Sequence, residues 1–152
     1  MNHGGDVTRG QFNRLAKGEQ DMYIEYLLKR PRYIILDGST VLVHAAVMTE
    51  NIKYNTLHEL MEQQDDFSMV WEVDRFIRRP FSMKYGQVIF GHTFTLMIRE
   101  MVGQPLDSVE IWKDGQRFGI DCGYQFGGRM AFLRLDDMKE YYLSPSGVVM
   151  IK

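Results

Sequence analysis

The fold of this chain is decided by a short stretch with the sequence VIFGHT, at residues 88–93. A run of branched and aromatic apolar residues next to a glycine is typical of a buried strand. A second stretch, VLVHAA at residues 41–46, has the same form, because its apolar run also ends in a histidine. Sheet proteins often place ligands and catalytic groups at strand ends, so His44 and His92 are the first candidates for a functional site.

Two histidines at the ends of neighbouring strands would supply half of a metal site. Neutral imidazole is the commonest side-chain metal ligand, and rigid strands hold a ligand firmly. A lone histidine near a strand end is more often a structural residue that hydrogen bonds to its surroundings. The repeated context favours a ligand pair, but the sequence alone leaves both interpretations open. His58, on an expected helix surface, is interpreted as solvent-exposed.

The composition is that of an ordinary globular protein. The chain has 152 residues, enough for one domain with a genuine core, and 45% of them are hydrophobic. Eighteen basic and twenty acidic residues give a net charge of −2, so neither a nucleic-acid polymer nor a membrane surface is an expected partner. The single cysteine, Cys122, excludes an internal disulfide. Together with the absence of a signal-peptide pattern, it predicts a cytoplasmic protein.

The order of the expected elements predicts a mixed α/β class. Two helices come first, then strands interrupted by helices, then hairpins whose turns are marked by Asp37-Gly38 and Asp114-Gly115. The expected helices are one from Asp6 or Thr8 to Ala16 with Gly18 as its stop, one over 19–29, a short one over 57–61, and one continuous helix over 65–77. The expected strands are 33–36, 41–43, 87–90, 109–112, 118–121, 130–135, 141–143 and 148–151.

Several glycines are candidates for shaping a site. Gly91 and Thr93 flank the second histidine, where a glycine permits close backbone approach and a threonine hydroxyl can hydrogen bond to the loop. Gly123, Gly127 and Gly128 follow an expected strand and would open space for a substrate beside the metal. The alternative is a tight loop between strands, which composition alone favours.

Arg75 is a candidate phosphate contact, with Arg78 and Arg79 nearby in the sequence. A guanidinium can donate two parallel hydrogen bonds to a phosphate group. The alternative is a solvated helix end, where basic side chains interact favourably with the helix dipole.

Four segments, taken in order, form a recognisable set. They are VLVHA at 41–45, VIFGHT at 88–93, IDCG at 120–123 with GGR at 127–129, and LRLD at 133–136. This set resembles the calcineurin-like metallophosphoesterases, in particular the branch of bacterial serine/threonine phosphatases and diadenosine tetraphosphatases, which show VHAG, VFGHT and IDTGAVYGG elements in the same order. GGDVT at 4–8 is similar to the NGG-x-x-T segment of that branch, so the resemblance covers nearly the whole chain.

The resemblance implies a two-metal phosphate-ester hydrolase in which His44 and His92 bind one of the metals. Such sites hold two divalent cations, with Mn or Fe the expected metals, and activate a water for in-line attack on phosphorus. The implied partner is a phosphorylated small molecule, a nucleotide or a phosphoprotein. The implied fold is the family's β-sandwich flanked by helices, with residues 1–152 as the carboxy-terminal portion of one domain.

The sequence also departs from the family. The motifs GDxHG, GDxxDRG and GNHE, which supply the remaining ligands, a phosphate-binding arginine and the general acid, do not occur in it. Val73 stands where the family has an arginine, with Arg75 as a substitute, and Ala46 and Tyr124 would narrow the site. We therefore expect a chain without the family's amino-terminal βαβ half, with no catalytic acid, inactive alone and prone to self-association through an exposed sheet.

Three hypotheses account for this pattern. The chain is the later part of a phosphatase that lost its beginning, a non-catalytic binding or structural module, or one half of a split phosphatase whose other half is a separate polypeptide. The first is favoured, because the loss of one contiguous segment requires a single event.

Overall fold

The structure, a computed structural model, describes residues 5–152 and divides the chain into two compact units. One unit extends up to Pro31 and the other spans Arg32–Lys152, and each is described by itself. Residue 4, where the NGG-like segment begins, lies outside the described residues. Nowhere in residues 5–152 is there a helix with the length and apolar character needed to cross a membrane.

The first unit contains two helices, α1 over Gly5–Phe12 and α2 over Lys17–Leu28. The predicted boundary between them is wrong, because Gly18 lies inside the first turn of α2 rather than ending a helix. The Glu19 carboxylate accepts a hydrogen bond from the Ala16 amide at 2.9 Å, which caps α2 two residues before its expected start. Within α2 the large apolar side chains are all exposed: Met22, Tyr23, Ile24, Tyr26, Leu27 and Leu28.

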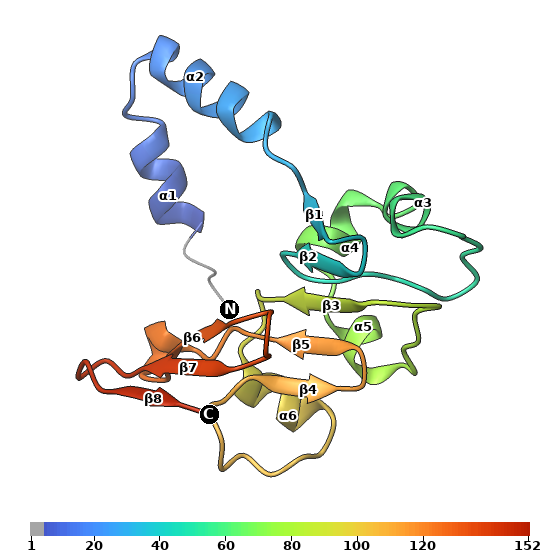
Figure 1. Cartoon of the computed structure of the whole chain (residues 1–152). Helices are drawn as coiled ribbons and strands as arrows, with labels where there is room; N and C mark the ends of the chain where they lie inside the picture. Colours follow the sequence, from blue (N-terminus) through green and yellow to red (C-terminus); the bar gives the residue numbers. More distant parts are fainter. Residues whose placement is uncertain (1–4) are drawn as a thin grey trace. The chain divides into compact units, whose positions relative to one another are not determined.

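The second unit is built on a five-stranded mixed sheet with the strand order β1-β2-β3-β5-β4 (Figure 1). The three central strands, β2, β3 and β5, run parallel to one another, and each edge strand pairs antiparallel with its neighbour. The structure therefore confirms the mixed α/β class and both predicted hairpins. The strands are β1 (Tyr33–Leu36), β2 (Thr40–Val43), β3 (Gln87–Phe90), β4 (Trp112–Asp114) and β5 (Arg117–Gly119).

The hairpin between β1 and β2 forms because its turn residues accept an unusual backbone. Asp37 and Gly38 have φ values of 48° and 64°, in the left-handed region. The favoured two-residue hairpin turns require this conformation, and Asp-Gly is one of the sequences that supply it at low cost. Between β4 and β5 the turn residues are Gly115 and Gln116, one residue later than expected, and Gly115 has a φ of 58°.

The helices of the second unit are short, and the prediction of one helix over 65–77 is wrong. The Asp65 carboxylate caps the first piece by accepting from the Ser68 amide at 2.9 Å. Glu72 accepts from the amides of Val73 and Arg75, which starts a second piece. The last helix was not predicted, because its N-cap residue, Phe94, offers no capping side chain. The helices are α3 (Leu57–Glu62), α4 (Asp66–Val70), α5 (Asp74–Arg78) and α6 (Thr95–Met101).

A second sheet of three antiparallel strands consists of β6 (Met130–Leu133), β7 (Glu140–Leu143) and β8 (Val149–Ile151). One of its faces packs against Ile111 and Cys122 through the buried ring of Tyr142. The opposite face exposes apolar side chains, and self-association through it stays a prediction. These exposed residues are Met130, Phe132, Val149 and Ile151.

A buried arginine joins the main sheet to α5. The Arg117 side chain is 4% exposed and donates hydrogen bonds to the carbonyl oxygens of Phe76 and Ile77 at the end of the helix. Three aromatic rings surround its guanidinium, with ring centres 5.2–5.5 Å from the Cζ atom. The charge is therefore compensated by dipoles and ring faces, together with an ion pair to Asp114. The rings are those of Phe76, Phe81 and Trp112.

Gly86 allows β3 to start beside β2, and replacing it by alanine should be costly. A Cβ atom at this position would lie 2.3 Å from the carbonyl oxygen of Ser39, which accepts the hydrogen bond from the Gln87 amide. We expect Gly86→Ala to lower the free energy of unfolding by about 3 kcal/mol or more, measured by urea denaturation. Gly103→Ala is the matched control, with the same left-handed φ but open space around it, and should cost about 1 kcal/mol. Equal losses would contradict a steric role for Gly86.

Candidate metal centre

The two candidate histidines lie at the same edge of the main sheet. Strands β2 and β3 are parallel neighbours, and their register pairs Val43 with Phe90, the last residue of each strand. His44 follows β2 directly, and His92 follows β3 by two residues. The Gly91 amide donates a hydrogen bond to the His44 carbonyl oxygen at 3.0 Å, which continues the pairing beyond the strands. The backbone of both strands therefore fixes the two histidines side by side.

The rings themselves are in contact. The Nε2 atom of His44 lies 3.0 Å from the Nδ1 atom of His92, with the ring planes inclined by 58°. One nitrogen donates a hydrogen bond to the other. The same separation suits two ligands of one cation, since nitrogens at about 2.1 Å from a metal and about 90° apart are about 3.0 Å from each other.

The histidine pair is not a complete metal site. Residues 5–152 contain no group of three or more histidine, cysteine, aspartate or glutamate side chains that could hold a metal ion. Hard divalent cations need oxygen donors in addition to imidazole. The described part of the chain therefore offers two nitrogen donors, and any further ligands would have to come from elsewhere.

The backbone at His92 is strained. Its φ of 67° lies in the left-handed region, which is uncommon for residues other than glycine and costs about 1–3 kcal/mol. The Thr93 amide donates to the Gly91 carbonyl oxygen at 2.7 Å, so the turn around the histidine is tight. A Cβ atom at Gly91 would meet the His44 carbonyl oxygen at an ordinary 3.8 Å, so close approach does not require this glycine. Strain of this kind clusters at functional sites, which favours a functional role for His92.

Trp71 lies beside the pair and was missed in the sequence analysis. Its ring centre is 5.3 Å from that of His92, and its side chain is 48% exposed. The tryptophan ends α4, which is tied to the segment after the first histidine by a hydrogen bond from the Ala45 amide to the Met69 carbonyl oxygen at 2.9 Å. No sequence pattern indicated this contact. The expected continuous helix over 65–77 had Trp71 in its interior, whereas the structure ends α4 there.

The third parallel strand, β5, leads to a segment beside the turn of His92. The Asp121 carbonyl oxygen accepts from the Thr95 amide at 2.8 Å, and the rings of Phe94 and Phe126 lie 5.2 Å apart. The Asp121 carboxylate accepts from the Gly123 amide at 3.1 Å and so caps its own turn. This hydrogen bond gives the Asp121 side chain a structural role.

The glycine-rich loop is tight, as in the alternative interpretation. Gly123 and Gly127 have φ values of 69° and 83° and flank a single 3₁₀ turn, η1, over Tyr124–Phe126. At Gly128 a Cβ atom would lie 2.1 Å from the carbonyl oxygen of Cys122, so only glycine fits there. These glycines shape the loop through its backbone.

Two other expected site residues belong to the core or to another pocket. Ala46 is completely buried in the main core, so its methyl group does not narrow the site. Arg75 forms an ion pair with Glu50, with 3.8 Å between Nη2 and Oε2, in a pocket whose lining includes neither histidine. The structure therefore does not place Arg75 in a common pocket with His44 and His92.

The comparisons with known proteins add no relative. No protein-family model matches the chain, and a search of the curated proteins finds no match. The likeness to the metallophosphoesterases accordingly stays a resemblance of motifs. The geometry of the histidine pair is the observation from which a function is argued.

Metal binding to the pair should be visible in the fluorescence of Trp71. A paramagnetic ion such as Co²⁺ on the two imidazoles would lie close to this indole and quench it, whereas Trp112, the other tryptophan, is buried. We expect saturable quenching that weakens at least about tenfold in His44→Ala and in His92→Asn, because each removes one of two donors. His58→Ala, on the exposed face of α3, is the control and should leave the titration unchanged. Equal weakening in the control would rule out binding at the pair.

Cys122 should make stability depend on pH in the alkaline range. Burial raises the pKa of its thiol to about 12 in the folded chain, against about 8.5 when exposed. The stability that the buried neutral thiol contributes is fully present below about pH 8.5. It is lost as the pH rises towards 12, because in this range the thiol ionises only in the unfolded chain. We expect the free energy of unfolding to fall by up to about 1.4 kcal/mol per pH unit more steeply than in Cys122→Ala. Parallel pH profiles for the two proteins would contradict this.

Proposed function

We propose that this chain contributes the two-histidine part of a metal centre that hydrolyses phosphate esters. The observation that carries the proposal is the 3.0 Å separation between Nε2 of His44 and Nδ1 of His92 at the ends of adjacent parallel strands. The motif resemblance supports it independently, because it implied the same two residues as ligands of one metal.

In this proposal the protein's task is to hold two imidazoles ready for a cation. Strands β2 and β3, with the hydrogen bond from Gly91 to His44, fix the relative position of the two backbones. The exposure of His44 leaves its ring accessible from solvent. A bound divalent cation, with Mn or Fe expected, would supply Lewis-acid activation of water and neutralise phosphoryl oxygens. The 3.0 Å separation of the two nitrogens is compatible with two adjacent ligands of such an ion.

The remaining donors would come from a second polypeptide segment. Two-metal hydrolysis requires oxygen donors in addition to imidazole, and the described residues contain no such cluster. A segment equivalent to the family's amino-terminal βαβ half would add these donors and the general acid. The chain alone is then inactive, and the substrate of the completed centre is a phosphorylated small molecule, a nucleotide or a phosphoprotein.

A non-catalytic module is the second candidate. The lack of a third donor in residues 5–152 favours it, because the two rings already hydrogen bond to each other. In such a module the histidines would hold β2 and β3 together at their ends, and no cation would be needed.

Complementation separates these candidates. The chain is fused, through a flexible linker, to an amino-terminal metallophosphoesterase half that carries GDxHG, GDxxDRG and GNHE, and hydrolysis of p-nitrophenyl phosphate is measured with Mn²⁺. We expect activity in the fusion and none in either half. His44→Ala and His92→Asn should each lower kcat/KM at least about a hundredfold, and His58→Ala should not. A folded, Mn²⁺-binding fusion without activity, or activity that survives both substitutions, would overturn the hydrolase proposal.

A further inference from the structure

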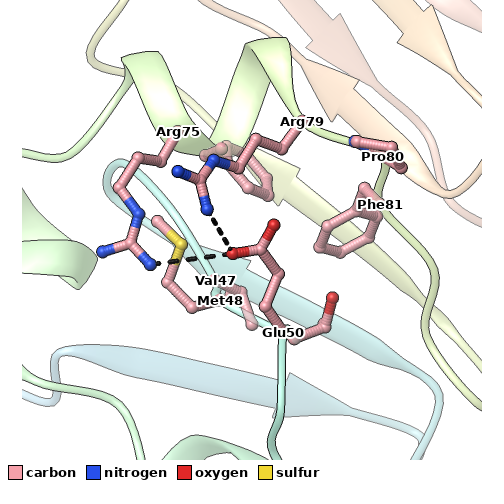
Figure 2. Close-up of a pocket in the computed structure, with 9 residues that line it drawn as sticks. Val47, Met48, Glu50, Arg75, Arg79, Pro80 and Phe81 are labelled. Atoms are coloured by element: carbon pink, nitrogen blue, oxygen red, sulfur yellow. Dashed lines mark hydrogen bonds and ion pairs between the residues drawn. The ribbon is translucent and has the colours of Figure 1, made fainter.

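A pocket on the second unit brings together three charged side chains (Figure 2). Arg75 is the second residue of α5 and Arg79 is the first residue after this helix, and both point at one oxygen of Glu50. Glu50 comes from the long segment between β2 and α3, which has no regular secondary structure. The other lining residues are uncharged: Val47, Met48, Thr49, Phe76, Pro80 and Phe81.

The pocket has more donors than its carboxylate uses. Arg79 donates to Glu50 Oε2 at 2.8 Å, whereas Arg75 Nη2 is 3.8 Å from the same atom, beyond hydrogen-bond distance. A guanidinium carries five N–H donors, so most of those on both arginines are available. Within residues 5–152 the Arg75 guanidinium has this ion pair and no side-chain hydrogen bond.

Arg78, on the same helix, shows the contrast. Its Nε atom donates to Asp74 at 2.7 Å, and its Nη1 atom donates to the Met101 carbonyl oxygen at 2.6 Å. This arginine is therefore engaged with a carboxylate of its own and with the end of α6. In the pocket, two positive charges share one negative charge, which leaves a net charge of +1 with unused donors around it.

We propose that Arg75 and Arg79 bind a phosphate group, and that Glu50 occupies their site when no phosphate is bound. Planar guanidinium forks match phosphate oxygens in pairs. A phosphate dianion can compete with a tethered carboxylate, which carries a single charge, and Glu50 can turn towards solvent because it is 35% exposed. The proposal does not rest on metal binding at the histidines.

The size and walls of the pocket narrow the ligand to a small phosphomonoester or free phosphate. The free space is about 10 Å³, room for about one water molecule, so a bound phosphate has to take the place of the Glu50 carboxylate. Phe81 and Pro80 form an apolar wall next to the arginines that suits the organic part of an ester (Figure 2).

The test is a titration of the whole chain with inorganic phosphate and with phenyl phosphate, by calorimetry in the presence of EDTA. EDTA keeps the histidine pair free of metal, so a bound cation cannot recruit phosphate. Sodium chloride of matched ionic strength is the reference, because half-exposed charges are screened by salt. We expect saturable, millimolar binding that weakens about tenfold in Arg75→Gln and in Arg79→Gln. Tighter binding of phenyl phosphate than of inorganic phosphate would show that the apolar wall contacts the organic group of an ester. Equal binding of the two would show that the site recognises free phosphate.

The change in phosphate affinity caused by Glu50→Gln distinguishes the proposal from a purely structural ion pair. Removing the competing carboxylate should tighten phosphate binding several-fold, whereas a purely structural ion pair predicts no binding in either protein. Glu50→Asp, which retracts the carboxylate but keeps its charge, replaces this variant if Glu50→Gln fails to fold, and should tighten binding less. Arg78→Gln is the matched control for the loss of one positive charge on α5 and should bind as the unmodified chain does. Binding that is absent in all variants, or that falls equally in Arg78→Gln, would overturn the proposal.

Discussion

The arrangement of the second unit depends on the parallel pairing of β2 with β3. Antiparallel partners would have placed the two histidines at opposite edges of the sheet, but parallel strands end at the same edge. The pairing starts where Gly86 lets the chain pass close to Ser39, and it ends with the hydrogen bond from Gly91 to His44. Between these points the strands are buried on the core side and cannot slip, because a shift by one residue would expose Val41 and Val88. The contact between the rings is thus a consequence of backbone register.

Local chemistry made much of this fold predictable. Asp37-Gly38 and Gly115 located the turns of two hairpins, since few other residues accept a left-handed backbone at low cost. Apolar runs located β2 and β3, and a histidine after each run located the candidate site. The helix boundaries were harder to predict from the sequence, because the side chains of Glu19 and Glu72 define them through one or two hydrogen bonds each.

Long-range contacts were outside the reach of the sequence. The place of Trp71 next to the second histidine depends on how α4 folds back over the sheet, and no local pattern encodes that. The same holds for Arg75, whose charge suggested a phosphate contact but whose partner, Glu50, lies on a distant segment. The structure brings together the two histidines that follow β2 and β3. The motif resemblance carried no information about their surroundings in this chain, where the glycine loop is tight and Ala46 lies buried in the core.

The buried Arg117 has a consequence for the motions of the chain. Its guanidinium binds the terminal carbonyl groups of α5 while its backbone belongs to β5, the strand next to β3. Separating the helix from the sheet would take two carbonyl acceptors and the Phe76 ring away from a buried positive charge, which is far more costly than losing a neutral contact. Helix and strand are therefore expected to open and close as one cooperative unit in native-state fluctuations. The pocket of Arg75 and Arg79 and strand β5 would then have the same free energy of local unfolding.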